Sequence, residues 1–438
     1  MAHTIPLALP VEFVDKYAID LTARSSDGWV FAHVGAEFGP GGDMYVLSRL
    51  WRYKPRGEEA EDPAQQSVSA WLVARHPADG DGTPAAFAVF LTPRRYSEFG
   101  DASDLDLAVL PDGNVALTGT PDATYLLDGA LTRVLRSYTT QPRWSARGAY
   151  VLGDPFATRL KATPGGRLLC LVAEYGLRRD ANLAPNLIAL TDEALTAERR
   201  PPLRAIAALS ASPVPQDAEA DAYISCDGQE PGMVPRPAPG LAETLWPPRF
   251  SRPGHGLGRP VPLSEDRFVV PLFGRLHRGG TRGNDFAFVL MDDSGKVLGQ
   301  LEGMDRWRDS PYTGGCYQVV ADPARGRIFH LNRYGLYAWS ADGTLLAKVP
   351  TDDKPFTLLK NFALLGCGPD GELLLVQEKQ NLLVRLPVPH DGLVEGLAPA
   401  IATGLAVFGK QRPAIKKQWT QVEWRWTYRP APGRLHFL

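Results

Sequence analysis

The sequence predicts an all-β fold: a single β-propeller of six four-stranded blades, or seven in the alternative, with the ring closed near the termini. Three observations support this prediction. Residues 317–353 contain four short runs of apolar residues separated by turn residues. Five further segments repeat that arrangement, and both ends of the chain carry alternating stretches that suit a closing strand.

The segment 317–353 is the clearest copy of the repeat. Its runs are too short for helices and are rich in β-branched and aromatic residues, such as Val319, Ile328 and Trp339. Gly326 and the pair Asp342-Gly343 close two of its three joints, as expected of turns between antiparallel strands. One such sheet is apolar on both faces and must pack between neighbours, and radial repetition of packed sheets makes a propeller.

The other copies follow the same plan along the chain. Each has one joint between its first two strands and another between its last two, and these joints are built from Gly and Asp. The six copies are predicted at residues 29–92, 105–138, 159–200, 260–303, 317–353 and 361–404. Cys170, Cys316 and Cys367 fall in or beside these strands, which predicts small buried apolar side chains rather than metal ligands.

The lengths of the connections predict that the two faces of the disc differ. In a blade, the turns between strands 1 and 2 and between strands 3 and 4 lie on one face, here called the short-joint face. The connections between strands 2 and 3 and between blades lie on the other, the long-connection face. Few residues separate the two joints of the copy 105–138, from Asp112 to Asp128, and many separate those of the copy 29–92, from Gly41 to Asp79. The extra residues lie in the connection between strands 2 and 3, which belongs to the long-connection face. Binding sites concentrate on loops that a rigid scaffold holds, which favours that face.

Three segments fall outside the regular repeat. Residues 1–28 are predicted to be an N-terminal closure segment, and residues 405–438 a C-terminal closure strand with a basic and aromatic tail. Apolar and polar residues alternate in 421–429, so this stretch suits pairing with residues 11–20 to close the ring. Residues 201–258, rich in Pro and Ala, are either a long excursion between blades or a degenerate seventh blade.

Two copies carry a resemblance to known repeats. The stretches LAVLPDGNVALTGTPDATYLLDGALTRVL and VVADPARGRIFHLNRYGLYAWSADGTLLAKV resemble the short blades of NHL-type and YVTN-type β-propeller repeats. The resemblance covers residues 29–404 apart from 201–258, and it rests on joints of low specificity. It implies the fold and no particular activity, because such blades serve lactonases, lyases, sensors and scaffolds alike.

The connections between strands 2 and 3 supply the candidate binding residues. In five copies these connections are basic, and aromatic residues stand among the arginines, a combination that suits a carboxylate or phosphate group and a stacked ring. The alternative is an ordinary solvated loop, since acidic residues lie nearby. The candidates are Trp51, Arg52, Tyr53, Tyr175, Arg178, Arg179, Arg275, His277, Arg278, Arg282, Arg333 and Tyr334.

The C-terminal tail forms a second basic and aromatic group. Lys410, Arg412, Lys416 and Lys417 precede the alternating aromatic residues of 421–429. Such interleaving can grip single-stranded nucleic acid, but alternation is also what a packed strand shows. The packed strand is the preferred interpretation, and no nucleic-acid partner is expected.

An enzymatic function of such a propeller would need polar residues at its central channel. Lactonase-type propellers hold a divalent cation there with oxygen ligands, and Glu37, Asp104, Asp106 and Asn361 are candidates that no spacing ties together. The sequence has no nucleophile elbow, phosphate loop or zinc-protease motif, and its histidines are scattered among the copies. No cofactor is expected, except a divalent cation under this alternative.

The net charge of the chain gives no reason to expect binding to nucleic acid or to an anionic membrane. With 47 basic and 49 acidic residues the net charge is -2, so no overall field steers the chain onto nucleic acid or an anionic membrane. No run approaches the roughly 20 apolar residues that span a bilayer, and the N-terminus lacks a leader pattern, which predicts a cytoplasmic protein. The expected function is a non-enzymatic scaffold that binds a protein or peptide, possibly acidic, within a multi-subunit assembly. The alternative is a metal-dependent, lactonase-like hydrolase or lyase.

Overall fold

The structure of the chain is a computed structural model. It describes residues 3–6, 29–52, 69–79, 84–91, 106–120, 123–139, 143–144, 150–151, 159–172, 187–191, 193–195, 203–208, 256–257, 259–278, 281–303, 319–332, 334–377, 382–419 and 435–437.

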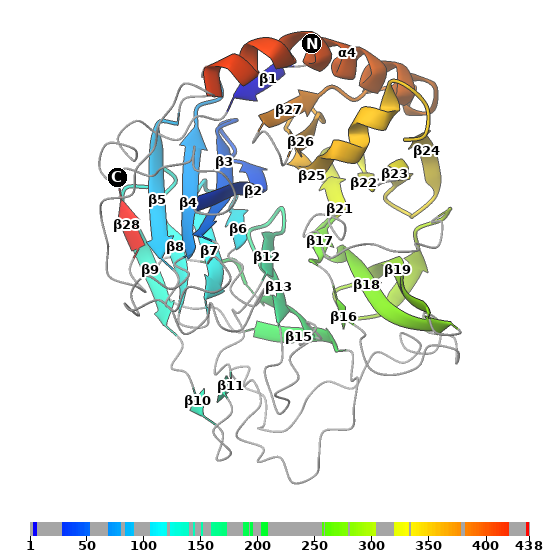
Figure 1. The fold of residues 1–438 in the computed structure, drawn as a ribbon. Coiled ribbons are helices and arrows are strands. Elements are labelled where there is room, and N and C mark those ends of the chain that lie inside the picture. Colours follow the sequence, from blue (N-terminus) through cyan, green and yellow to red (C-terminus); the bar gives the residue numbers. More distant parts are fainter. Residues whose placement is uncertain are drawn as a thin grey trace.

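Six antiparallel sheets stand around an axis, which confirms the six-bladed propeller (Figure 1). Blade 1 contains β2 (Trp29–Phe38), β3 (Met44–Arg52), β4 (Ser69–His76) and β5 (Ala86–Leu91). Blade 2 contains β6 (Asp106–Val109), β7 (Val115–Thr120), β8 (Ala123–Leu127) and β9 (Val134–Thr139). Blade 3 contains β12 (Arg159–Ala162), β13 (Leu168–Val172), β14 (Leu187–Thr191) and β15 (Leu203–Ala208).

The second half of the ring follows the same order. Blade 4 contains β16 (Gly256–Leu257), β17 (Val261–Pro262), β18 (Arg267–Arg278), β19 (Thr281–Asp292) and β20 (Val297–Gln300). Blade 5 contains β21 (Val319–Asp322), β22 (Arg327–Leu331), β23 (Gly335–Ser340) and β24 (Leu345–Pro350). Blade 6 contains β25 (Phe362–Cys367), β26 (Leu373–Gln377) and β27 (Leu382–Leu386). A short ribbon of β10 (Arg143–Trp144) and β11 (Tyr150–Val151) stands apart from the blades. The first strands contact one another in a closed cycle, β2, β6, β12, β17, β21, β25 and back to β2.

Short Asp and Gly joints connect the strands as predicted. At the first joint of blade 2, Asp112 Oδ1 accepts the backbone N–H of Asn114 at 2.9 Å, and Gly113 has φ +85°. At the second joint of blade 5, Asp342 Oδ1 accepts the N–H of Thr344 at 3.2 Å, and Gly343 has φ +92°. The aspartate satisfies turn donors, and glycine takes the left-handed conformation without a Cβ clash. The interpretation of Asp342-Gly343 as a turn is therefore confirmed.

The ring closes near the termini, but with other residues than predicted. Strand β1 (His3–Pro6) pairs antiparallel with β27 and supplies the fourth strand of blade 6, with Thr4 opposite Val384. At the other end, β28 (Leu435–Phe437) pairs with β5 on the outside of blade 1. The predicted closure pair, residues 11–20 and 421–429, lies outside the described residues. The pairing of β1 with β27 covers an edge of blade 6 that would otherwise be open.

The last part of the sixth copy is a helix, not a strand. Residues after Asp391-Gly392 form α4 (Leu393–Trp419), although that pair was predicted to be a joint before a fourth strand ending at 404. Leu397, Ile401 and Leu405 recur at helical spacing and are buried, and they pack with Phe408 against blades 5 and 6. The basic stretch from Lys410 onward therefore continues a helix, up to residue 419. Figure 1 shows α4 lying along the rim of the ring beside β1 and β27.

Blade 3 also ends later than predicted. Its fourth strand, β15, lies at Leu203–Ala208, inside the segment 201–258 that was assigned to an excursion, and β16 lies at its other end. Pro201 and Pro202 obscured the strand, because prolines suggest a loop until the chain is seen to enter the sheet behind them. Residues 209–255 lie outside the described part of the chain.

The hydrophobic core lies between neighbouring blades. Leu169 and Ile188 of blade 3 pack against Phe268 and Val270 of blade 4, and all four are fully buried. Burying each such side chain contributes about 1.5–3 kcal/mol, so the apolar blade faces hold the ring together. Cys170 belongs to the core between blades 2 and 3, where burial and then Asp106 raise the pKa of its thiol to about 12.

No helix among the described residues combines the length and apolar character that a membrane crossing requires. The predicted cytoplasmic location stays a prediction.

Candidate functional site

The predicted binding residues lie only partly in the described structure. Tyr53, Tyr175, Arg178, Arg179 and Arg333 fall outside the described residues. Trp51 and Arg52 end strand β3, opposite Val30 and Trp29 of β2. Tyr334 lies between β22 and β23, where its N–H donates to Asn332 Oδ1 at 2.7 Å. The described candidates thus occur where strand 2 ends or where strand 3 begins, in blades 1, 4 and 5, and His277 stands opposite Arg282 in the strand register.

In blade 4 the predicted connection 274–283 is a β-ribbon. Arg275, His277 and Arg278 belong to β18, and Arg282 belongs to β19. The register runs without a shift to the pair Arg278 and Thr281. The candidate residues of this blade are therefore strand residues.

At the inner strands, two carboxylates link three blades each. Glu37 of blade 1 accepts the N–H of Val109 in blade 2 at 2.8 Å and pairs with Lys161 Nζ of blade 3. Asp106 of blade 2 accepts the N–H of Leu160 in blade 3 at 3.0 Å and pairs with Arg259 of blade 4. Each carboxylate therefore reaches a backbone donor one blade on and a cation two blades on. That reach exists only where the strands converge, so Glu37, Asp106, Lys161 and Arg259 form an axial cluster.

The axial cluster is buried and pairs two acidic with two basic side chains. The side chain of Asp106 is 1% exposed and that of Arg259 10%, while Lys161 and Glu37 are 16% exposed. Burial, and next the positive charge of Arg259, lowers the pKa of Lys161 well below its usual value. Ion pairs removed from water depend on their partners, because the loss of one leaves a desolvated charge.

The carboxylates of the axial cluster are engaged by protein groups. Sequence analysis named Glu37 and Asp106 as possible inward residues, and in the structure each carboxylate is engaged by a cation and a backbone donor. Asp104 lies outside the described residues. Asn361 ends the short helix η5 (Phe356–Asn361) just before β25. Among the described residues no group of three His, Cys, Asp or Glu side chains is placed to hold a metal ion.

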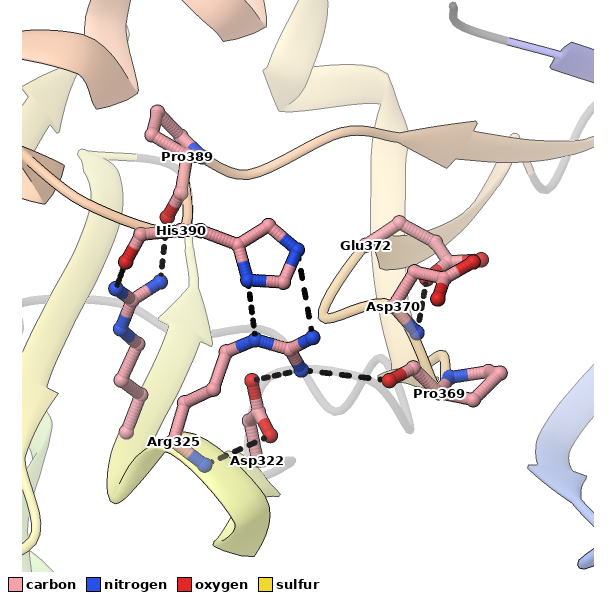
Figure 2. A network of polar contacts seen from close by, with 8 residues as sticks. Asp322, Arg325, Pro369, Asp370, Glu372, Pro389 and His390 are labelled. Carbon is pink, nitrogen blue, oxygen red and sulfur yellow. Dashed lines mark hydrogen bonds and ion pairs between the residues drawn. The ribbon is translucent and has the colours of Figure 1, made fainter.

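A second polar network joins blades 5 and 6 on the short-joint face (Figure 2). The short helix η4 (Pro323–Arg325) forms the first joint of blade 5. Arg325 Nε donates to His390 Nδ1 at 3.1 Å, and its Nη1 pairs with Asp322 Oδ2 at 3.1 Å and donates to the carbonyl of Pro369 at 3.4 Å. We call this set the Arg325 network.

Next to it, Arg327 holds the segment that leads into α4. Its Nη1 donates to the carbonyl of Pro389 at 2.6 Å, and its Nη2 donates to the carbonyl of His390. In blade 6, Glu372 accepts the N–H of Asp370 at 3.1 Å and pairs with Arg385. The two arginines of blade 5 thus fix the start of the helix that covers blades 5 and 6.

A third network joins blades 3 and 4 on the same face. Arg167 Nε pairs with Glu265 Oε2 at 3.1 Å, and the hydroxyl of Thr163 donates to the same oxygen at 3.0 Å. The N–H of Gly165 donates to Glu265 Oε1. We call this set the Glu265 network. It connects the first joints of adjacent blades.

Sequence reasoning missed these networks. Lys161 and Glu265 lie in stretches that were assigned to strands or turns, and Arg259 stands between the excursion and the fourth copy. No spacing links them to partners that are 98 to 153 residues away. One local signal was present: Asp106 and Lys161 are charged residues inside runs assigned to inner strands, where charge is rare unless it is paired.

His330 lies in a packed strand, as the sequence predicted. It is fully buried in β22, and its ring meets that of Phe288 edge-on at 4.8 Å. It is part of the packed core between blades 4 and 5.

The chain was compared with known proteins. No protein-family model matches it, and no curated protein matches it significantly. Solved structures align with it at low similarity. The β-propeller domain of Cps50 (Swd1) from Myceliophteria thermophila aligns over 80% of this chain and 84% of that chain, with 8% identity and a TM-score of 0.35. The WD40 domain of Pan2 from Neurospora crassa aligns over 83% and 96%, with 9% identity and a TM-score of 0.34.

Raptor from Chaetomium thermophilum aligns over 86% of this chain but only 30% of its own, with 9% identity and a TM-score of 0.36. All three carry too little similarity to assign a function. The fold assignment rests on the strand pairings of this chain, and the NHL-like and YVTN-like resemblance stays a prediction.

Proposed function

We propose that this chain is a non-enzymatic scaffold whose long-connection face binds a protein or peptide partner within a multi-subunit assembly. The candidate residues for this role are the basic and aromatic residues of the strand 2 to strand 3 connections. They are drawn from different blades, and a ring presents the same connection of every blade on one face. A partner on that face contacts several blades at once.

The observation that carries the proposal is the contrast between the two faces. On the short-joint face, described polar side chains are used to join neighbouring blades: Arg325 bonds blade 6, Glu265 bonds blade 3, and the Tyr45 hydroxyl donates to the carbonyl of Gly129 at 2.6 Å. Those side chains serve the ring itself. The inserted residues of the sequence belong to the other face.

The hydrolase alternative finds no support in the described residues. A lactonase-like site needs several oxygen ligands directed at one cation. The axial carboxylates are instead engaged by Lys161 and Arg259, which carry the charge that a metal ion would supply.

Affinity purification from the native host tests the scaffold proposal. The tagged wild-type chain is expected to recover a defined partner in stoichiometric amount. Changing Arg178, Arg179 and Arg333 together to serine is expected to reduce recovery at least tenfold, because the sequence assigns these residues to connections between strands 2 and 3. A matched control changes Arg133, Arg267 and Lys296, exposed residues at joints on the short-joint face, and is expected to retain the partner.

The proposal fails if the wild-type chain recovers no defined partner, or if the control loses the partner and the test variant keeps it. Thermal unfolding of both variants checks that the ring is intact.

A further inference from the structure

The hairpin of β18 and β19 is unlike the other strand pairs of the ring. Both strands have 12 residues, and twelve pairs join them from Arg267 and Asp292 to Arg278 and Thr281 without a bulge. Its outer neighbour, β20, pairs only with Val289 to Met291. The hairpin therefore extends beyond the rest of its sheet as a two-stranded ribbon (Figure 1).

Blade 1 shows that length alone does not leave an edge open. Strands β2 and β3 are also long, with 10 and 9 residues. In that blade β4 covers the outer edge of β3 from Met44 to Trp51. In blade 4, among the described residues, no strand pairs with β19 from Thr281 to Ala287 on its outer side. An edge of this kind offers unpaired backbone groups to another chain.

The register shows which backbone groups face outward. The carbonyl of Phe288 accepts the N–H of Leu301 at 2.9 Å, so the backbone of Phe288 faces the β20 side. In a strand, alternate residues direct their N–H and C=O groups to the same edge. Arg282, Asn284 and Phe286 therefore present their backbone groups outward, while the residues between them serve the ladder with β18.

The open edge lacks three of the devices that prevent pairing. Proteins blunt such edges with proline, with a bulge, with a very short strand or with charged side chains, and of these the unpaired stretch carries only charges, Arg282 and Asp285. The sequence of β19 contains no proline, and its pairing with β18 has no register shift. A register shift does occur on the outer side, between Leu290 and Met291, where β20 is already paired.

The charge of the ribbon indicates what kind of chain fits. Between positions 274 and 285 the sequence carries Arg275, Arg278 and Arg282 but a single acidic residue, Asp285. An extended peptide gains affinity from main-chain hydrogen bonds to such an edge, and its side chains set specificity. Acidic residues complement the three arginines.

We propose that the outer edge of β19, from Arg282 to Phe286, docks an extended acidic peptide that adds to the sheet of blade 4 as a further antiparallel or parallel strand. This inference rests on the proposed scaffold function and names the chemistry of the partner. The backbone of Arg282, Asn284 and Phe286 provides the hydrogen bonds, and the arginines of the ribbon provide the preference for acid.

A defined peptide probe tests the docking site. The probe is a fluorescein-labelled ten-residue peptide of alternating Glu and Thr, and its binding to the full chain is followed by fluorescence anisotropy in low salt. A peptide of alternating Lys and Thr is the charge control. The Glu peptide is expected to bind at least tenfold more tightly, and serine at Arg275, Arg278 and Arg282 together is expected to abolish that preference. The variant at Arg133, Arg267 and Lys296 is expected to keep it.

Two further arms separate strand addition from simple charge attraction. Asn284→Pro removes one outward N–H and leaves the β18 ladder intact, while Asn284→Ala keeps that N–H. The proline variant is expected to lose at least tenfold in affinity and the alanine variant less than twofold. A Glu peptide N-methylated at every second residue is expected to bind the wild-type chain at least tenfold more weakly, which tests the same point without altering the protein.

Several outcomes overturn the inference. It fails if the Glu peptide does not bind, or if neither N-methylation nor Asn284→Pro weakens binding, since charge alone then explains it. It also fails if light scattering shows a wild-type dimer that Asn284→Pro dissociates, because the occupant is then a second copy of this chain. The scaffold proposal is judged separately. If Asn284→Pro still recovers the native partner and the change of Arg178, Arg179 and Arg333 does not, the scaffold stands and the edge site is wrong.

Discussion

The axial cluster and the Glu265 network both join blades through a carboxylate, but they do so in different surroundings. At the axis, the side chain of Asp106 is 1% exposed and its partner Arg259 is 10% exposed. On the short-joint face, the side chain of Glu265 is 43% exposed and its partner Arg167 is 17% exposed. The axial carboxylates each touch two further blades, whereas Glu265 touches one.

This difference indicates two separate roles. A buried charge is costly unless its partner is present, so the axial cluster makes blades 1 to 4 depend on one another. An exposed pair is screened by water and salt and contributes little, so the Glu265 network adds orientation between two joints rather than much free energy. The axial cluster is thus the electrostatic centre of the first four blades.

Asp106→Ala is expected to give the largest effect. It removes the partner of Arg259 and the acceptor of the Leu160 N–H, so a buried cation and a buried donor lose their bonds at once. We expect the free energy of unfolding to fall by about 3–5 kcal/mol. Urea denaturation followed by tryptophan fluorescence measures it.

Asp106→Asn is the control for shape. The amide retains an oxygen for the Leu160 N–H but no charge for Arg259, so its loss is expected to lie between wild type and Asp106→Ala. A loss below about 1 kcal/mol for Asp106→Ala would contradict the burial argument, because only exposed pairs are that weak.

The sequence predicts features set by neighbouring residues better than contacts between residues that are far apart along the chain. Turns such as Asp112-Gly113 are set by neighbouring residues, so the joints and the number of blades were predictable. Glu37 and Asp106 could be placed near the channel by their position in inner strands. Their partners could not, since Lys161 and Arg259 come from blades two positions further on.

Two elements were missed for a different reason. The helix α4 has a clear spacing signal in Leu393, Leu397, Ile401 and Leu405, but the preceding Asp391-Gly392 pair matched the repeat and suggested another strand. Strand β1 has four residues and no alternating pattern that marks it, and its place is set by the open edge of β27. Tertiary pairing decides such short strands.

Glu265→Gln tests how much the more exposed Glu265 network contributes to stability. The single amide oxygen can accept from Gly165 or from Thr163 but not from both, and the ion pair with Arg167 is lost. We expect a loss of about 0.5–1 kcal/mol in the free energy of unfolding, reduced in 1 M salt because the pair is partly exposed. Urea denaturation at low and high salt measures both values.

Asp352→Asn is the matched control for an exposed pair that joins no blades. Asp352 pairs with Lys360 at 3.1 Å, and their side chains are 75% and 41% exposed. No measurable change is expected. If Glu265→Gln costs as much as Asp106→Ala, burial does not distinguish the two networks and the comparison is wrong.

Asp342→Asn is expected to give the smallest effect, and one that depends on pH. The hydroxyl of Ser340, and next the N–H of Thr344, donates to the Asp342 carboxylate and lowers its pKa. A folded-state pKa below the unfolded value of about 3.9 means that the ionised group stabilises the fold above that pH. This contribution is lost as the pH falls through the folded pKa.

The urea midpoint of Asp342→Asn is therefore expected to lie slightly below that of wild type at pH 7 and to converge with it below about pH 4. Measurements at pH 7, 5, 4 and 3 test this, with Ser340→Ala in the Asp342→Asn background as the control that removes the donor. A difference that persists or grows at pH 3 would show that the carboxylate charge is not what Asp342 contributes. Convergence would show that Asp342 stabilises only its own turn. Asp106, in contrast, joins three blades.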